Sequence, residues 1–419
     1  MRSVVITGIG LVTCLGQEKA EVGGKLRAMR HGFVRYPPFL KDEKIPISVA
    51  APLPGFDTSS KDPEDWSFPE GIHFRLEQLR GLSPNALYAH FALRNAARDA
   101  GLELEALSDE RTGLYTASSG SAAMTWFHLD RMKRVGPLRC PPMGIVASIA
   151  GTLNFNLAAA YRIRGSTAGF VSACASSGHA MGFAFDEIAL GRQDRMVVVG
   201  AEDFTEETIV PFSGMRVLSL NPDPDSASRP FDRNRDGFVG TGGAVCLLLE
   251  AGEIAEKRGA PVHARLAGWG QATDGYHVAA SHPDGEGLAR AMRLALRSAG
   301  WEPGAVDYVN AHATSTQAGD VSECRALKSM FTGNRQPAIS STKALTGHAL
   351  SLSSIMEAAF CLLAMDQGFI PGSAHITELD PEAEGLNILT ASRPGAPGRV
   401  LSNSSGFGGV NVVLALEKP

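Results

Sequence analysis

The chain has 419 residues, of which 44% are hydrophobic and 20% are charged, so it holds enough apolar material for a large core and two domain-sized halves. Its 39 basic and 44 acidic residues give a net charge of −5, which offers no basic footprint for nucleic acid. Charge or glycine interrupts every apolar stretch before it reaches about 18 residues, so we expect no membrane span.

The six cysteines show neither a disulfide framework nor the CxxC pairs of a zinc ribbon. Scattered cysteines of this kind are typical of a reducing compartment, and we expect a cytoplasmic protein. The first residues, MRSVVITGIGLVT, have one arginine and no small-residue cleavage site after a long apolar core. We therefore interpret them as a first strand over residues 3–7 followed by a glycine turn, and not as a signal peptide.

Strand and helix patterns alternate along the whole chain. In the first part, a helix is expected over 85–102 and strands over 111–118, 195–201 and 244–250. In the second, strands are expected over 260–269, 307–310, 336–340, 399–403 and 410–416, with helices over 285–300 and 351–368. Each part ends on paired strands, which indicates a weak duplication of element order and an α/β fold.

Residues 165–191 contain the most informative pattern in the chain. A short apolar run leads through Ser172-Ala173-Cys174 into a segment with helical periodicity, which places Cys174 at a strand-to-helix turn. Unpaired N–H groups and the positive end of the helix dipole favour a thiolate at such a position, so Cys174 is a candidate nucleophile. The alternative is a small buried cysteine in a packing turn.

Two histidines share this strand-end placement: His312 and His348 each lie just beyond a short β-like run. Functional groups of α/β folds gather beyond the carboxyl ends of strands, although a lone histidine there is more often structural. A cysteine with two histidines suggests acyl transfer, in which the thiolate attacks and the imidazoles stabilise an oxyanion or enolate. A cysteine protease, the competing enzyme class, would need one histidine oriented by Asn or Asp.

The stretches SACASS, NAHATSTQAGD, SSTKALTGHALS and SNSSGFGG resemble those of the β-ketoacyl-[acyl carrier protein] synthases of the thiolase superfamily, in the family's order and spacing. The elongating type is the most similar. The resemblance implies a thiolase-like fold in which two pseudo-duplicated halves form α-β-α-β-α layers. We expect one half at 1–251, carrying the cysteine, and the other at 252–419, carrying both histidines.

The resemblance also implies roles in a decarboxylative condensation that gives a 3-oxoacyl-[acyl carrier protein]. Cys174 would take the acyl group, and His312 and His348 would hydrogen-bond the malonyl thioester carbonyl. Lys343 and Glu357 match a lysine and a glutamate that fix charge and orientation. The backbone N–H groups of Cys174 and Phe407 would form an oxyanion hole, and the gate residues would be Phe407, Gly408 and Gly409.

Binding roles follow from the same resemblance. Thr314 and Thr316 match threonines that bind the carrier's pantetheine arm, and Gly120 aligns with a position that limits the depth of the acyl pocket. Acidic carrier proteins favour a basic rim, for which the candidates are Arg80, Arg131, Lys133 and Arg134. The reaction requires no cofactor or metal. The expected partners are acyl carrier protein and a second copy of the chain, or a related chain in a heterodimer.

Four departures from the family pattern set limits on this resemblance. Ser405 replaces a phenylalanine of NSFGFGG, residues 351–354 read SLSS in place of GAAG, Ala313 replaces a glycine, and Thr241 replaces a glutamate. Three alternatives stay open: a non-condensing, chain-length-factor-like partner; an acyl-CoA acyltransferase, which would use a second cysteine near the C-terminal glycine turn; and a binding module. The acyl chain, the pathway and the dimer type are not determined by the sequence.

Overall fold

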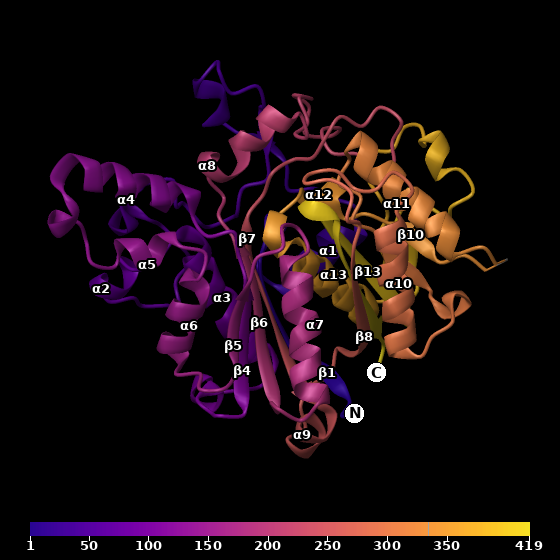
Figure 1. Ribbon diagram of the computed structural model, residues 1–419, viewed down its shortest axis with the longest axis horizontal. Coiled ribbons are helices and arrows are strands. Elements are labelled where there is room, and N and C mark those ends of the chain that lie inside the picture. Colours follow the sequence, from indigo (N-terminus) through magenta and orange to yellow (C-terminus); the bar gives the residue numbers. More distant parts are fainter. Residues whose placement is uncertain (334) are drawn as a thin grey trace.

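The structure is a computed structural model that describes residues 1–333 and 335–419. Its centre is a ten-stranded mixed sheet with the order β10-β9-β13-β14-β8-β1-β7-β6-β4-β5 (Figure 1). The strands from the first part of the chain are β1 (Val4–Val12), β4 (Thr112–Ala117), β5 (Thr167–Phe170), β6 (Arg195–Glu202) and β7 (Gly243–Ala251). Those from the second part are β8 (Ala264–Thr273), β9 (Tyr308–Asn310), β10 (Ala338–Ser340), β13 (Arg399–Gly406) and β14 (Val410–Glu417).

The strand order repeats between the two parts of the chain. From the middle outward, the first part runs β1-β7-β6-β4-β5 and the second runs β8-β14-β13-β9-β10, so strands of equal rank occupy equal places. The two groups meet where β1 pairs antiparallel with β8, through Val5 with Arg265 and Ile6 with Ala264. This repeat confirms the duplication of element order that the sequence predicts.

Two helices lie between the halves. Helix α7 (Ser176–Ala189) contacts β4 and β6 of the first half and β8 and β14 of the second, and α13 (Ser353–Gln367) contacts β6, β7 and β13. On the outer faces, α3 (Pro84–Asp99) and α6 (Thr152–Tyr161) cover the first half, while α10 (Glu286–Ala299) covers the second and packs on α11 (Gln317–Met330). Figure 1 shows α7 and α13 at the centre of the fold. The α-β-α-β-α layering is thereby confirmed.

Shorter elements complete the described chain. The helices are α1 (Lys19–Arg27), α2 (Leu76–Leu79), α4 (Ala122–Val135), α5 (Gly144–Ser148), α8 (Glu206–Ile209), α9 (Gly252–Lys257) and α12 (Lys343–Thr346). Two small sheets pair β2 (Val34–Arg35) with β3 (Val49–Ala50) and β11 (Phe369–Ile370) with β12 (Arg393–Pro394). Across residues 1–333 and 335–419, none of the helices combines the length and the apolar character that a membrane crossing needs.

The first strand is longer than the sequence suggests. The expected turn at Gly8 and Gly10 is wrong, because β1 continues through both glycines to Val12. A Cβ atom at Gly8 would lie 2.3 Å from the Ala96 carbonyl oxygen, and one at Gly10 would lie 1.8 Å from that of Ala92. These glycines therefore allow α3 to pack directly on the strand, as glycine does where two backbones approach closely.

Helix α9 follows the last strand of the first half. The predicted second half begins at residue 252, and α9 contacts β1 and β7. β8, the first strand of the second half, begins at Ala264.

The buried side chain of His263 bonds to carboxylates from both halves of the chain. His263 Nε2 lies 2.8 Å from Asp99 of α3, and its Nδ1 lies 2.7 Å from Asp366 of α13. Burial opposes protonation, but the hydrogen bonds to Asp366 and Asp99 outweigh it and raise the pKa of His263 to about 9. At neutral pH the ring is therefore an imidazolium between two carboxylates.

We expect this network to make stability depend on pH in the alkaline range. Because the pKa of His263 is raised on folding, its contribution is complete below the unfolded value of about 6.5 and is lost as pH rises through about 9. Wild-type protein should lose about 2 kcal/mol more than His263→Gln between pH 6.5 and 9.5. Urea unfolding of both proteins at the two pH values measures this, and equal losses would contradict it.

Candidate active site

The turn that presents Cys174 connects β5 to α7. Ala173 has a left-handed backbone conformation with φ of +50°, which is strained for a residue with a side chain. Ser176 Oγ stabilises this turn by accepting a hydrogen bond from the Ser172 N–H at 2.8 Å and donating one to the Ala173 carbonyl at 2.6 Å. The chain therefore holds Cys174 on a tight turn just before the first residue of α7.

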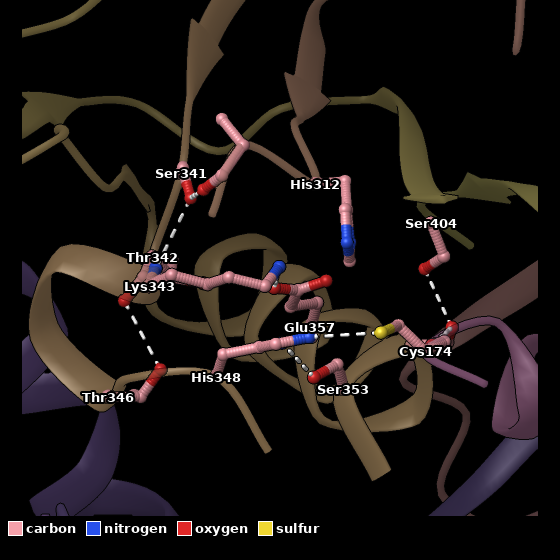
Figure 2. A network of polar contacts seen from close by, with 12 residues as sticks. Cys174, His312, Ser341, Thr342, Lys343, Thr346, His348, Ser353, Glu357 and Ser404 are labelled. Atoms are coloured by element: carbon pink, nitrogen blue, oxygen red, sulfur yellow. Dashed lines mark hydrogen bonds and ion pairs between the residues drawn. The ribbon is translucent and has the colours of Figure 1, made fainter. Parts of the chain in front are cut away.

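His348 reaches Cys174 from the other half of the chain. Helix α12 ends at Thr346, Gly347 turns the chain with a φ of +77°, and the His348 N–H donates to the Val239 carbonyl at 2.8 Å. His348 Nε2 lies 3.0 Å from Cys174 Sγ, and its Nδ1 lies 2.9 Å from Ser353 Oγ (Figure 2). Both ring nitrogens are thus engaged.

His312 lies beyond the end of β9 and faces the same point. The buried carboxylate of Glu323 accepts the backbone N–H groups of His312 at 3.0 Å and Ala313 at 2.7 Å. The two histidine rings are 5.3 Å apart at an angle of 83°, and both point toward Cys174 (Figure 2). The ligand-type atoms of Cys174, His312 and His348 all lie within 4.8 Å of one another, so the group has the atom types to hold a metal ion or to perform acyl transfer.

A buried ion pair lies behind the histidines. Lys343 Nζ bonds Glu357 Oε1, and the two side chains are 1% and 2% exposed (Figure 2). Burial raises the pKa of Glu357 to about 7, against the opposing charge of Lys343. The pair therefore brings a cation beside the histidines while keeping its charge partly compensated.

Burial sets the protonation of the reacting groups. It lowers the pKa of His312 and His348 well below the ordinary value, and the positive charge of Lys343 adds to this effect. Both rings are therefore neutral at neutral pH, and each can donate one N–H. Burial also raises the pKa of Cys174 to about 12, only partly opposed by Lys343. Desolvation of the sulfur thus opposes the thiolate that the helix terminus favours, and the thiolate stays a prediction.

A cavity of about 950 Å³ opens onto these groups. Six of the residues to which the resemblance assigns a role line it: Cys174, His312, Thr314, Thr316, His348 and Phe407. Its apolar wall includes Phe212, Phe238, Leu288 and Leu350. Gly406 packs against Cys174, since a Cβ there would lie 3.0 Å from the Cys174 backbone nitrogen. The glycine turn that precedes Phe407 is therefore in contact with the cysteine.

The remaining predicted residues near the cavity are not part of its wall. Lys343 and Glu357 form the layer behind the histidines. Gly408 and Gly409 are held by the neighbouring loop, through bonds from Gly408 N–H to the Val278 carbonyl and from Asp274 N–H to the Gly409 carbonyl. Ser119 and Ser121 line the cavity, whereas the structure places Gly120 between them with φ of +85°.

The basic candidates are spread over the surface. Lys133 and Arg134 are exposed on α4, whose Trp126 and Leu129 form part of the cavity wall. Arg134 pairs with Asp130, Arg80 pairs with Glu64, and Arg131 is half-buried. Sequence reasoning missed Arg216, an exposed cation on the cavity wall.

Several supporting residues were also missed, most of them at the serines that depart from the family pattern. Ser351 bonds the buried Glu202, Ser353 bonds His348, and Ser354 donates to the Cys174 carbonyl at 3.1 Å. The sequence shows these hydroxyls as departures at helix-packing positions, and only the fold shows their partners. Glu323, on the helix after His312, has no sequence signal of its own.

Comparisons with known proteins match this geometry. The family models for the N-terminal and C-terminal domains of beta-ketoacyl synthase match residues 1–255 and 263–377. The chain is 37% identical to "3-oxoacyl-[acyl-carrier-protein] synthase 1" of Haemophilus influenzae, over 100% of this chain and 99% of that protein. It is equally identical to the enzyme of that name from Escherichia coli K12, with the same coverage.

Solved structures agree. A beta-ketoacyl synthase from Burkholderia phymatum superposes with a TM-score of 0.91 at 33% identity, covering 100% of both chains. The chain belongs to the beta-ketoacyl synthase family, the acyltransferase-type condensing enzymes that extend acyl chains by decarboxylative condensation with a malonyl unit. The elongating synthases are the relatives that the sequence resemblance indicated.

We expect the stability of the protein to depend on having both members of the ion pair behind the histidines, or neither. Glu357→Leu leaves the Lys343 ammonium buried without its carboxylate, and Lys343→Met leaves the reverse, so each should cost about 3–5 kcal/mol of unfolding free energy. The double variant Lys343→Met/Glu357→Leu should be more stable than either single variant. Urea unfolding measures all three, and single variants as stable as wild type would contradict the arrangement.

Proposed function

We propose that Cys174 is the nucleophile that carries the growing acyl chain. Its Sγ attacks the carbonyl carbon of an acyl thioester, the thioester C–S bond breaks, and the thiol proton leaves with the departing pantetheine sulfur. The 3.0 Å contact between Cys174 Sγ and His348 Nε2 carries this proposal, because an N–H that the neutral imidazole donates to the sulfur stabilises the attacking thiolate.

His312 and His348 are proposed to act on the malonyl thioester that binds next. Both donate N–H to its carbonyl oxygen while the bond to the carboxylate breaks and carbon dioxide leaves. The electron pair forms an enolate, whose carbon attacks the acyl-Cys174 carbonyl and expels the sulfur. Two neutral donors in a buried site stabilise that enolate more than water does. The product is a 3-oxoacyl thioester two carbons longer.

The other predicted residues take supporting roles in this proposal. Backbone N–H groups of Cys174 and Phe407 form the oxyanion hole, which the contact between Gly406 and the Cys174 nitrogen supports. Phe407 is the gate, with Gly408 and Gly409 giving the turn its freedom. Lys343 and Glu357 fix charge and orientation behind the histidines.

We propose that substrates arrive on acyl carrier protein, the carrier in the names of the relatives. Thr314 and Thr316, which are 3.0 Å apart through their hydroxyls on the cavity wall, bind the pantetheine arm. Arg80, Arg131, Lys133 and Arg134 contribute to the basic surface for this acidic partner. Gly120 occupies the position that sets the depth of the acyl pocket, where a glycine leaves space for a longer chain.

The protein is proposed to work in the cytoplasm as a homodimer, with one half at residues 1–251 and the other at 252–419. Strand β5 is the last strand of the sheet and has an unpaired edge, which a second copy can extend. Exposed apolar side chains flank that edge in sequence, namely Phe155 and Val171, and Phe183 follows on α7. A heterodimer with a related chain would use the same edge.

The direct test is product formation from malonyl carrier protein and acyl carrier proteins that differ in chain length. We expect a 3-oxoacyl product two carbons longer, read by mass spectrometry, and its loss in Cys174→Ala because the variant has no nucleophile. His312→Ala should lower the condensation rate about 100-fold or more while Cys174 remains acylated, and His348→Ala should slow both acylation and condensation.

Other outcomes identify the alternatives. Acylation of Cys174 without extension would indicate a chain-length-factor-like partner that needs a second subunit, and transfer to coenzyme A without loss of carbon dioxide would indicate an acyltransferase. The position of Cys174, His312 and His348 within 4.8 Å of one another favours the condensing enzyme over both.

Charge reversal on α4 tests the carrier surface. Lys133→Glu/Arg134→Glu should raise the apparent KM for acyl carrier protein roughly five- to tenfold, since repulsion replaces attraction at the cavity rim. Alkylation of Cys174 should not change. Arg293→Glu/Arg297→Glu on the outer helix α10 is the matched control with the same change in charge. An unaltered KM in the α4 variant would contradict the assignment.

A further inference from the structure

Ser353 is a buried hydroxyl in contact with the active site that the proposed reaction does not use. It is the first residue of α13 and is 1% exposed. Its Oγ lies 2.9 Å from His348 Nδ1, and it accepts a hydrogen bond from the Ala349 N–H at 3.2 Å. The side chain therefore spans the back of the histidine and the backbone that follows it (Figure 2).

These two contacts decide which nitrogen of His348 carries the proton. If Nδ1 carried it, Ser353 Oγ would accept twice, and its own buried proton would have no partner among the residues that the structure describes. If Ser353 donates to Nδ1, the hydroxyl proton and Nδ1 are both satisfied, and only the thiol proton of Cys174, a weak donor, has no acceptor at Nε2. The proton of the neutral ring is then on Nε2, which faces Cys174 Sγ at 3.0 Å.

We propose that Ser353 is a positioning residue that holds neutral His348 in the Nε2–H tautomer, so that its N–H points at Cys174 and at the substrate carbonyl in front of it. This inference rests on the proposed function for its effect on rate. The tautomer itself follows from the hydrogen bonds alone.

The serine gives this chain a device that the family pattern GHxxGAAG lacks, since an alanine there has no hydroxyl to donate. Neighbouring serines bond other groups: Ser351 bonds Glu202, and Ser354 bonds the Cys174 carbonyl and Ser404. The SLSS segment, which the sequence presents as an obstacle to close helix packing, is instead a set of hydrogen bonds around the nucleophile. Of these serines, Ser353 bonds a ring nitrogen of His348.

Removal of the Ser353 hydroxyl would change the pH at which His348 protonates, which also depends on the ionisable groups around the ring. Cys174 faces its Nε2, His312 lies edge-on to its ring, and Lys343 with Glu357 lies behind. Lys343 and burial disfavour the imidazolium whether or not Ser353 is present. A hydroxyl that donates to Nδ1 disfavours it further, because Nδ1 must gain a proton for the ring to become charged. Without the hydroxyl, His348 should protonate at higher pH.

The experiment uses full-length protein labelled with ¹⁵N-histidine, in which NMR shifts distinguish a protonated ring nitrogen from an unprotonated one. His348→Asn assigns the signal. We expect wild type to show protonated Nε2 and unprotonated Nδ1, and Ser353→Ala to show a mixture of both tautomers. Ser353→Thr, which retains a hydroxyl, should restore the single tautomer.

Kinetics supply the second readout. Ser353→Ala should lower kcat for condensation roughly tenfold with little change in KM for malonyl carrier protein, and the acid limb of its pH profile should move to higher pH. The matched control is Ser373→Ala, which removes another buried hydroxyl, one that accepts the Ser341 N–H. A purely structural effect would instead lower activity in both variants at all pH values.

Two results would overturn the inference: a wild-type His348 with its proton on Nδ1, or a Ser353→Ala variant with the wild-type tautomer and pH profile. The NMR readout requires no turnover. If wild type shows the Nε2–H tautomer yet forms no 3-oxoacyl product, the proposed function fails while the assignment of the tautomer stands.

Discussion

Desolvation of the reacting groups is the constraint on which the rest of the site depends. Burial keeps His312 and His348 neutral, and desolvation of the sulfur raises the pKa of Cys174. A neutral imidazole can donate to a developing enolate without first losing a charge. The same burial makes every unpaired polar group costly, which explains why Glu323, Glu357 and Ser353 each have a partner around the histidines.

The buried site lies between the two halves of the duplicated fold. Cys174 comes from the first half and both histidines come from the second, so the site exists only where the halves meet. Helices α7 and α13 lie side by side between the halves and begin at the same end. One follows the nucleophile and the other carries Ser353 and Glu357. The internal layer therefore serves as core and as support for the site.

The serines that depart from the family pattern can be explained only from the folded structure, which shows their hydrogen-bond partners. Ser351, Ser353 and Ser354 replace small residues at the start of α13, and each forms a hydrogen bond to Glu202, His348 or Cys174. Hydroxyls at these positions pack less closely than small apolar residues, but their hydrogen bonds fix the geometry of the groups around them. A divergence that looks unfavourable in sequence is consistent with a more tightly positioned active site.

The sequence by itself determined the alternation of strands and helices and the repeated element order, and it predicted Cys174, His312 and His348 as site residues, because periodicity and strand-end placement are local properties. Tertiary structure decided three features that the local sequence pattern does not predict. Gly8 and Gly10 lie in a strand because α3 packs on them, the pKa of Cys174 is raised because its sulfur is desolvated, and the serines support the site because the halves close around it. Each depends on what a distant segment places beside the residue.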